Sequence, residues 1–309
     1  MSPLSSARGS DRDANGNLIS ASRIVLGTAQ FGLQYGVANI EGRVSFSSVR
    51  EIMHLASASG IDMLDTAVAY GDSEERIGLV GAEQFNIVTK LPRVPNDESK
   101  IRDFVHKQVT QSLLNLRTQS LYGLLLHSPL QLLGSSGALL YKALQELKEK
   151  NLVQKIGISV YAPSDLVGLI PRYGLDIIQI PFSLVDRRLQ TSGWLRRLKD
   201  QSVELHTRSS FLQGLLLFPH NKIPPQFQHW RYLWDRWASW LTAHQNISPL
   251  AACIKFPLSF PEIDRVVVGV DSVSHLSEII EALRSADETS FPDLQCDDEL
   301  LINPTFWKP

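Results

Sequence analysis

Eight apolar segments alternate with helical segments along most of the chain, and this alternation limits the possible folds more than any other feature. The apolar segments cover residues 24–28, 61–65, 86–90, 122–127, 154–159, 176–180, 203–208 and 264–269. Continuous apolar runs of this length are typical of parallel strands that are buried on both faces. The helical segments cover residues 47–59, 73–80, 100–116, 136–151, 163–173, 187–200, 250–256 and 273–285. Repeated strand–helix units predict an α/β fold with a parallel sheet.

Two arrangements of such a sheet are compatible with the alternation, a closed barrel and a doubly wound open sheet. Open sheets that bind dinucleotides have a Gly-rich turn between an early strand and its helix. The stretch Gly27–Gly32 lacks that glycine spacing, and the sequence predicts no helix directly after it. We therefore predict a (β/α)8 TIM barrel, which commonly forms one domain of roughly 250 residues.

The barrel is predicted to extend over residues 21–309 as a single domain that includes a C-terminal tail. Residues 1–20 are polar and rich in Ser, Asp and Asn, so we expect a flexible segment there. The pair Asn15 and Gly16 is a strong hairpin signal, and it predicts a short hairpin within residues 12–22.

The composition is that of an ordinary globular protein, with 43% hydrophobic and 20% charged residues. A net charge of -2 gives no reason to expect nucleic acid or an anionic membrane as a partner. Cys253 and Cys296 are the only cysteines, so neither a disulfide framework nor a metal site is predicted. No apolar run approaches the roughly 18 residues that span a bilayer, and no signal sequence is recognisable, so we expect a cytoplasmic protein.

Three of the predicted strands end on an ionisable side chain. The second ends on Asp65, the third on Lys90 and the fourth on His127, and Tyr70 follows Asp65 by five residues. Parallel strands point the same way, so their carboxyl ends meet at one edge of the sheet. We therefore expect these four side chains to lie close together.

These residue types suit proton transfer to a carbonyl oxygen. A tyrosine with a pKa of about 10 is a poor acid at neutral pH, but a lysine ammonium beside it favours the phenolate. An aspartate can keep that lysine charged, and a histidine can orient the carbonyl group or relay the proton. The group is therefore suited to protonate oxygen while a hydride reaches the carbonyl carbon.

The order Asp65, Tyr70, Lys90 and His127, each at or just after a strand end, resembles the Asp-Tyr-Lys-His tetrad of the aldo-keto reductases. The resemblance extends over nearly the whole chain, from residues 24–28 to residues 266–270. It implies a (β/α)8 barrel with a hairpin at its base and a small-molecule carbonyl substrate. It also implies NADPH as cofactor, with NADH as the alternative, and a monomer or homodimer that needs no metal.

The resemblance also implies cofactor contacts at the later strands. In the family the fifth strand ends in a Ser-Asn pair that binds the nicotinamide carboxamide; here Ser159 is followed by Val160. Gln179 on the sixth strand matches a second carboxamide contact. Arg208 stands where the family has an aromatic residue that stacks on the nicotinamide, and a planar guanidinium can also stack on a ring.

Further cofactor contacts are assigned to the ends of the first, seventh and eighth strands. These residues are Gly27 and Thr28, then Ser209, Leu212 and Gly214 for the pyrophosphate, and Gly269, Ser272 and His275 for the adenosine phosphate. An ordinary polar strand end or surface loop is the alternative interpretation of these positions. Neither Lys nor Arg occurs in residues 269–275, so the sequence leaves NADP against NAD open.

Two long connections, residues 27–43 and 208–228, are predicted to lie over the tetrad, because long loops at this face of a barrel carry function. They and the C-terminal segment supply the candidate substrate contacts Gln30, Phe31, Tyr35 and Trp307. The Trp-rich stretch 230–241 has helical spacing, which fits either a buried helix face or a lid over the substrate.

The segment Leu26–Gly36 resembles a bacterial branch of the family that is associated with polysaccharide or natural-product pathways. This resemblance implies a sugar-like carbonyl compound as substrate. Two alternatives to net reduction stay open, a redox-neutral elimination or epimerisation on a bound dinucleotide and a non-catalytic regulatory subunit. The intact tetrad argues against the regulatory subunit, whereas Val160 and Arg208 leave room for the redox-neutral step.

Overall fold

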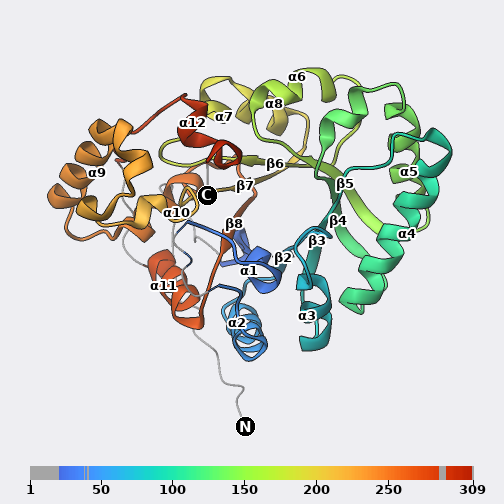
Figure 1. The fold of residues 1–309 in the computed structure, drawn as a ribbon, viewed down its shortest axis with the longest axis horizontal. Helices are drawn as coiled ribbons and strands as arrows, with labels where there is room; N and C mark the ends of the chain where they lie inside the picture. Colours follow the sequence, from blue (N-terminus) through green and yellow to red (C-terminus); the bar gives the residue numbers. More distant parts are fainter. Residues whose placement is uncertain (1–20, 38, 40–41, 285–289, 308–309) are drawn as a thin grey trace, which may run out of the picture.

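The computed structural model describes residues 21–37, 39, 42–284 and 290–307. In this part of the chain eight parallel strands close into a barrel in sequence order, which confirms the predicted (β/α)8 fold (Figure 1). The strands are β1 (Ile24–Gly27), β2 (Met63–Asp65), β3 (Asn86–Leu91), β4 (Leu121–Leu126), β5 (Val153–Ser159), β6 (Ile177–Pro181), β7 (Glu204–Arg208) and β8 (Arg265–Gly269). Pairing of β8 with β1 closes the barrel. The predicted hairpin lies outside the described residues, except that residues 21–23 form a 3-10 helix, η1.

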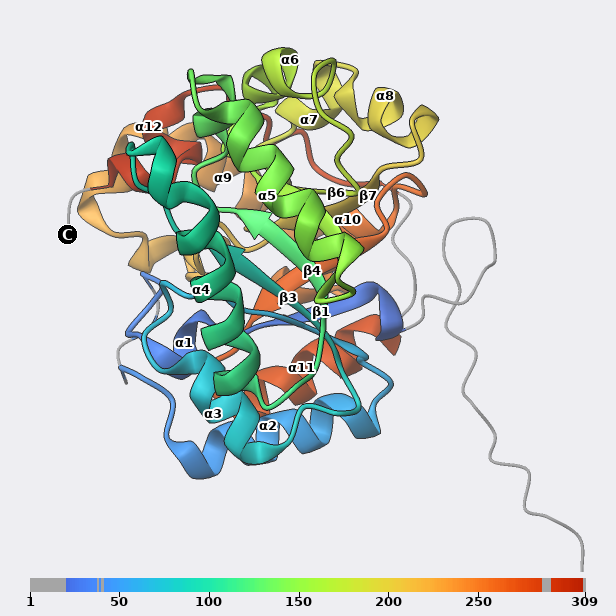
Figure 2. The same ribbon diagram turned by 90° about the vertical axis from the view of Figure 1, so that its right-hand side faces the viewer.

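Helices surround the barrel and connect its strands (Figure 2). They are α2 (Phe46–Ala58), α3 (Ser73–Val80), α4 (Glu98–Leu116), α5 (Gly137–Glu149), α6 (Leu166–Leu169), α7 (Arg188–Thr191), α8 (Trp194–Asp200), α9 (Arg231–Ala243), α10 (Pro249–Leu258) and α11 (Val273–Arg284). Two short helices, α1 (Ala29–Gly32) and α12 (Glu299–Ile302), belong to the loops around the barrel. No helix in the described part of the chain is both long and apolar enough to cross a membrane.

Three local predictions of helical segments were wrong. The stretch 163–173 is helical only as η3 (Pro163–Asp165) and α6, because Pro171 has no backbone N–H with which to continue the helical hydrogen bonds. The stretch 187–200 is divided into α7 and α8 by Gly193, which has a φ of 75°. The stretch after β1 contains the single-turn helix α1, where none was predicted.

Two separate apolar cores hold the barrel together. The larger core lies between the outer face of the strands and the helices. The smaller core fills the barrel interior and consists of Val25, Met63, Val88, Leu125 and Ile177. Alternate residues of a strand point to the same side, so residues two positions further along these strands also face the interior. Those positions are Asp65, Lys90, His127 and Gln179, which therefore form a polar layer directly above the apolar one.

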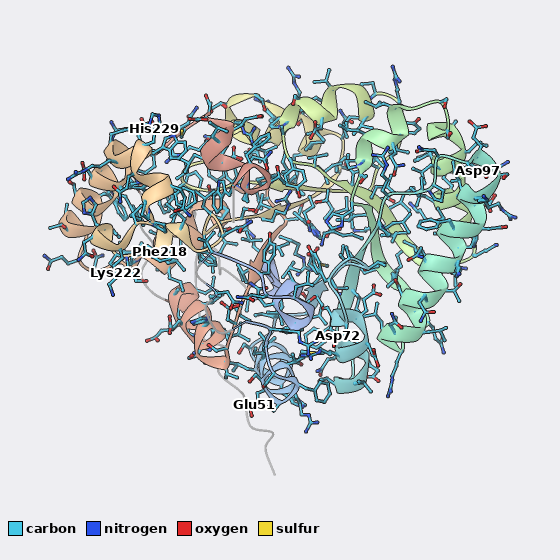
Figure 3. The ribbon with its side chains drawn as sticks, in the orientation of Figure 1. Glu51, Asp72, Asp97, Phe218, Lys222 and His229 are labelled. Carbon is cyan, nitrogen blue, oxygen red and sulfur yellow. The ribbon has the colours of Figure 1, made fainter. Side chains whose placement is uncertain are left out.

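The connections after β1 and β7 are the long ones, as predicted. The second contains the 3-10 helices η4 (Leu215–Leu217), η5 (His220–Lys222) and η6 (Pro225–Trp230) and leads into α9. Figure 3 shows Phe218, Lys222 and His229 beside α9, at the opposite side of the molecule from Asp97 at the start of α4. The β7 connection therefore extends one side of the barrel outward.

Candidate active site

Lys90 and Asp65 form a buried ion pair at the carboxyl ends of neighbouring strands. Asp65 is the last residue of β2 and pairs in register with Val88 of β3, so Lys90 emerges on the same interior face two residues later. Its Nζ donates to Oδ1 of Asp65 at 2.5 Å and to the backbone oxygen of Thr66 at 3.0 Å. The side chain of Lys90 is only 2% exposed, so these two acceptors take the place of water.

The surroundings of Lys90 keep its ammonium charged. Burial alone would lower the pKa of Lys90, but the nearby Asp65 and Tyr70 raise it above the usual value. The second carboxylate oxygen of Asp65 accepts a hydrogen bond from Nε2 of Gln179 at 2.7 Å. The Oε1 atom of Gln179 accepts one from Oγ of Ser159 at 3.2 Å. This chain of bonds connects β2, β3, β5 and β6 and fixes the position of the ion pair.

Tyr70 lies beside this pair in the tight loop between β2 and α3. Its backbone nitrogen donates to the backbone oxygen of Ala67 at 2.9 Å, and its backbone oxygen accepts from the backbone nitrogen of Ser73 at 3.1 Å. The Nζ atom of Lys90 is 5.1 Å from the centroid of the Tyr70 ring. A cation at this position attracts the negative charge that a phenol oxygen acquires when it gives up its proton.

His127 follows β4 directly and faces the ring of Tyr70. Its backbone nitrogen donates to the oxygen of Leu91 at 3.0 Å, and the two rings meet edge to face with centroids 6.1 Å apart. Burial, and then the positive charge of Lys90, lower the pKa of His127 from 6.5 to about 4. The imidazole is therefore neutral at pH 7, and one of its nitrogens can donate a hydrogen bond to a carbonyl oxygen.

A cavity of about 380 Å³, called here the β1–β8 cavity, begins at Asp65 and Tyr70 and continues between the loops after β1 and β7 to the start of α11. Most of the assigned cofactor residues line it: Gly27, Thr28, Gln179, Arg208, Ser209, Gly214, Gly269 and His275. Gln30 and Tyr35, assigned to substrate, also line it. The cavity therefore brings together residues from both ends of the sequence.

A second cavity of about 570 Å³, called here the β3–β5 cavity, lies among the segments that follow β3, β4 and β5. His127 and Ser159 line it, together with Val160 and Tyr161. The cluster of Asp65, Tyr70, Lys90 and His127 therefore borders two cavities, with Tyr70 in the wall of one and His127 in the wall of the other.

Comparisons with known proteins give the family. "Uncharacterized oxidoreductase YqkF" of Bacillus subtilis (strain 168) is 24% identical over 250 residues, which is 75% of this chain and 80% of that protein. The aldo-keto reductase AKR11C1 from Bacillus halodurans has the same fold. Its holo form matches with a TM-score of 0.68 and 19% identity, over 86% of this chain and 88% of that one. For its apo form the TM-score is 0.65 and the identity 20%, over 80% and 84% of the two chains.

The sequence model of the aldo/keto reductase family matches residues 23–295, which is most of the chain. The chain belongs to this family. It is therefore an oxidoreductase that acts on carbonyl compounds, and the family generally uses a nicotinamide dinucleotide.

The β1–β8 cavity of this aldo-keto reductase has walls that fit a dinucleotide. Its β7 loop has left-handed backbone at Ser209, Leu212, Gln213 and Gly214, with φ of 65°, 49°, 52° and 91°. Left-handed residues turn successive amide N–H groups toward one side, which is an arrangement that binds phosphate. At Gly269 a Cβ would lie 2.6 Å from the side-chain amide of Gln30, so glycine lets this amide lie directly against the end of β8 in the cavity wall.

Arg208 lies at the boundary of the two cavities. Its Nη2 donates to the backbone oxygen of Val160 at 3.0 Å, and its guanidinium carbon is 4.7 Å from the centroid of the Tyr161 ring. The sequence predicted that this guanidinium stacks on a nicotinamide; in the structure it lies over a tyrosine of the β5 loop. Its contact with the cofactor stays a prediction.

Five residues assigned to cofactor or substrate do not line the β1–β8 cavity. Ser159 lines the β3–β5 cavity, Leu212 and Phe31 are buried, and Ser272 accepts a hydrogen bond from the nitrogen of His275 at the start of α11. Trp307 packs edge to face on Phe227, with ring centroids 4.7 Å apart. The proposed contacts of these residues with cofactor or substrate stay predictions.

Sequence reasoning missed several residues around the two cavities. Asn39 binds the loop after β1 to the end of β8, because its Nδ2 donates to Oδ1 of Asp271 at 3.1 Å. Gln213 reaches across from the β7 loop to the hydroxyl of Tyr35 at 3.4 Å. Arg93, in the segment after β3, lines the β3–β5 cavity. Their shared signal is a polar side chain in a connection that follows a strand.

Proposed function

We propose that this aldo-keto reductase reduces an aldehyde or ketone to the alcohol, with Tyr70 as the general acid. The observation that carries the proposal is the buried Lys90–Asp65 pair beside the ring of Tyr70. A buried cation is costly unless its charge is used or compensated, and a module that only bound a dinucleotide would gain nothing from placing one beside a phenol. The closed barrel and the family membership support the same reaction.

Each catalytic side chain has a distinct role in the proposed reaction. His127, neutral at pH 7, donates a hydrogen bond to the carbonyl oxygen and orients it toward Tyr70. The hydroxyl of Tyr70 gives its proton to that oxygen as negative charge develops there. Lys90 stabilises the resulting phenolate, and Asp65 keeps Lys90 charged and in place.

When bound, a reduced nicotinamide supplies the hydride that the carbonyl carbon accepts. The residues proposed to hold the dinucleotide are those of the β1–β8 cavity together with Ser159, whose hydroxyl already donates to Gln179. The left-handed β7 loop is proposed to bind the pyrophosphate through its backbone amides.

The charges around the β1–β8 cavity indicate that the protein discriminates only weakly between NADPH and NADH. Arg208 is the only Lys or Arg among the described residues that line this cavity, and it lies near His127 rather than near α11. The part formed by β8 and α11 instead presents the carboxylates of Asp271 and Glu278. Neighbouring carboxylates repel a 2′-phosphate, so we expect any preference for NADPH over NADH to be below about 100-fold.

The test combines binding with turnover. Purified protein is titrated with NADPH and with NADH while its tryptophan fluorescence is recorded, and nicotinamide absorbance is then followed with a panel of aldehydes, ketones and keto-sugars. We expect binding of both cofactors within the stated ratio and net oxidation of the nicotinamide by part of the panel. Binding without consumption by any carbonyl would contradict net reduction and favour a redox-neutral reaction. A preference above the stated ratio would contradict the cofactor prediction alone.

A further inference from the structure

The β3–β5 cavity can admit a molecule to the catalytic residues without using the β1–β8 cavity. Its walls come from the segments after β3, β4 and β5, and they include both His127 and Ser159. A volume of about 570 Å³ is in the range of small-molecule sites. A compound in this cavity can therefore present its carbonyl group to His127.

Arg93 gives this cavity an uncompensated positive charge. Its side chain is exposed at the cavity wall, and it has no ion-pair or hydrogen-bond partner among the described residues. Asp165 is the carboxylate in the same wall, and its Oδ2 accepts bonds from the backbone nitrogens of Tyr161 and Ala162 at 3.3 and 3.2 Å. The carboxylate therefore holds the β5 loop, while the guanidinium of Arg93 is left to bind a ligand.

A second guanidinium lies behind the opposite wall. Arg208 binds the backbone oxygen of Val160 and lies over the ring of Tyr161, and both of these residues line the β3–β5 cavity. Arg208 has no carboxylate partner among the described residues, whereas the charge of Lys90 is balanced by Asp65. Arg208 and Lys90 therefore both place positive charge near His127, which Asp65 offsets in part.

The rest of the wall is suited to hydroxyl groups. Asn96, Ser128 and Ser135 line the cavity, and none of their side chains has a hydrogen-bond partner within the described ranges. An amide and two hydroxyls can each donate and accept a hydrogen bond. They match a substrate that carries hydroxyl groups between its carbonyl and its acidic end.

We infer that the substrate is a hydroxylated aldehyde or ketone with a carboxylate or phosphate group, and that Arg93 binds this anionic group. The inference rests on the proposed function, because it places the carbonyl of this compound at His127 and Tyr70. The guanidinium of Arg93 can meet either oxoanion with two parallel hydrogen bonds, which a neutral compound cannot offer.

The test compares matched pairs of carbonyl compounds at saturating NADPH. Glucuronate with glucose tests a carboxylate, and glyceraldehyde 3-phosphate with glyceraldehyde tests a phosphate. In the wild type we expect the acidic member of at least one pair to have a kcat/KM about 10- to 100-fold above the neutral member. Which pair shows the larger ratio identifies the source of the oxoanion.

Variants at Arg93 separate recognition from chemistry. Arg93→Gln should raise the KM for the acidic compound and so remove its higher kcat/KM over the neutral compound. The kcat for the acidic compound and the kcat/KM for the neutral compound should change by less than about 2-fold. Arg93→Lys should keep part of the advantage, because it keeps the charge but loses the fork of donors. Arg172→Gln is the matched control, since this arginine is exposed and does not line the cavity.

Equal turnover of acidic and neutral members in the wild type would overturn the inference and leave the reductase assignment intact. The same conclusion would follow if the acidic compound kept its higher kcat/KM in Arg93→Gln. If no compound oxidises NADPH, the proposed function fails. Calorimetric measurement of how each compound binds then tests whether Arg93 forms an anion site. Binding of the acidic member that depends on Arg93 would sustain that site, and equal binding of both members would overturn it.

Discussion

Single residues of the polar layer have two kinds of role, a proposed part in the chemistry and the compensation of a buried charge. Lys90 shows both, because its ammonium is buried and yet held in its charged form by Asp65. The sequence predicted this pairing from the strand ends. It did not predict that Gln179, which is 114 residues away from Asp65, binds the other carboxylate oxygen.

Tyr70→Phe should separate chemistry from binding. The variant keeps the ring that contacts His127 and lies near Lys90, but it loses the hydroxyl that is proposed to protonate the carbonyl oxygen. We expect kcat to fall by at least about 100-fold, the lower end of general acid catalysis, while the Kd for NADPH changes by less than about 3-fold. Steady-state kinetics and fluorescence titration measure the two quantities. Tyr232→Phe on the exposed side of α9 is the control, and retained turnover in Tyr70→Phe would refute the acid assignment.

At the scale of elements, the β2–α3 loop is positioned by a backbone contact with α1. A Cβ on Gly32, the last residue of α1, would lie 1.7 Å from the backbone oxygen of Tyr70. A Cβ on Gly71, which has a φ of 58°, would lie 2.6 Å from the oxygen of Gly32. Two glycines therefore let α1 and the loop touch, and this contact sets the position of Tyr70.

Gly32→Ala should displace the β2–α3 loop that holds Tyr70. The added methyl group meets backbone atoms that cannot rotate away, so we expect the free energy of unfolding to fall by about 1–3 kcal/mol. Because Tyr70 moves with the loop, kcat should fall as well. Denaturant unfolding and steady-state kinetics test both effects. Gly168→Ala in α6 is the control, because its Cβ would meet only side-chain atoms of Leu133. Unchanged stability and kcat in Gly32→Ala would show that the loop is placed by other contacts.

The structure of the Trp-rich helix α9 distinguishes between a buried helix face and a lid over the substrate, which its sequence left open. Leu233, Trp234 and Trp237 are buried, and Nε1 of Trp234 donates to the backbone oxygen of Phe227 at 2.8 Å. None of the α9 residues lines either cavity. The interpretation as a buried helix face is therefore confirmed, and the helix supports the β7 connection from the side.

At the scale of the whole molecule, the barrel interior has polar groups at both ends of its apolar core. At the end away from Lys90, Glu204 accepts a hydrogen bond from the hydroxyl of Tyr122 at 2.7 Å and pairs with Lys155. Its other oxygen is 2.7 Å from Nε2 of His206. Burial alone would raise the pKa of Glu204, but His206, Lys155 and Tyr122 together lower it from 4.5 to about 2.

This cluster should make the fold sensitive to acid. Glu204 has a lower pKa in the folded than in the unfolded chain, so its contribution is complete above pH 4.5 and is lost as the pH falls toward 2. The shift corresponds to an upper limit of about 3 kcal/mol. Glu204→Gln should therefore lower the free energy of unfolding at pH 7 and have a much smaller effect near pH 2.

Urea unfolding of the wild type and Glu204→Gln across this pH range measures the difference. Glu51→Gln is the matched control, because Glu51 is exposed on the outer face of α2, where Figure 3 labels it. A destabilisation by Glu204→Gln that does not depend on pH would mean that the loss of packing, and not of charge, is responsible.

The sequence by itself determined the barrel and the residues that converge at its mouth. Apolar runs separated by helical stretches specify buried parallel strands, and strands of one direction must bring their carboxyl ends to one edge. Asp65, Lys90 and His127 were therefore predictable from their positions alone, and Tyr70 from its place in the loop after β2.

Only the tertiary structure decided which side chains meet across the barrel and where cavities remain. Arg208 binds the backbone of Val160, and Tyr122 binds Glu204, although 48 and 82 residues separate these partners in the chain. Such pairs depend on strand register and closure, which bring together residues from strands that are distant in sequence. The sequence pattern of one strand predicts which of its residues face inward, but it does not predict which residues of other strands they contact.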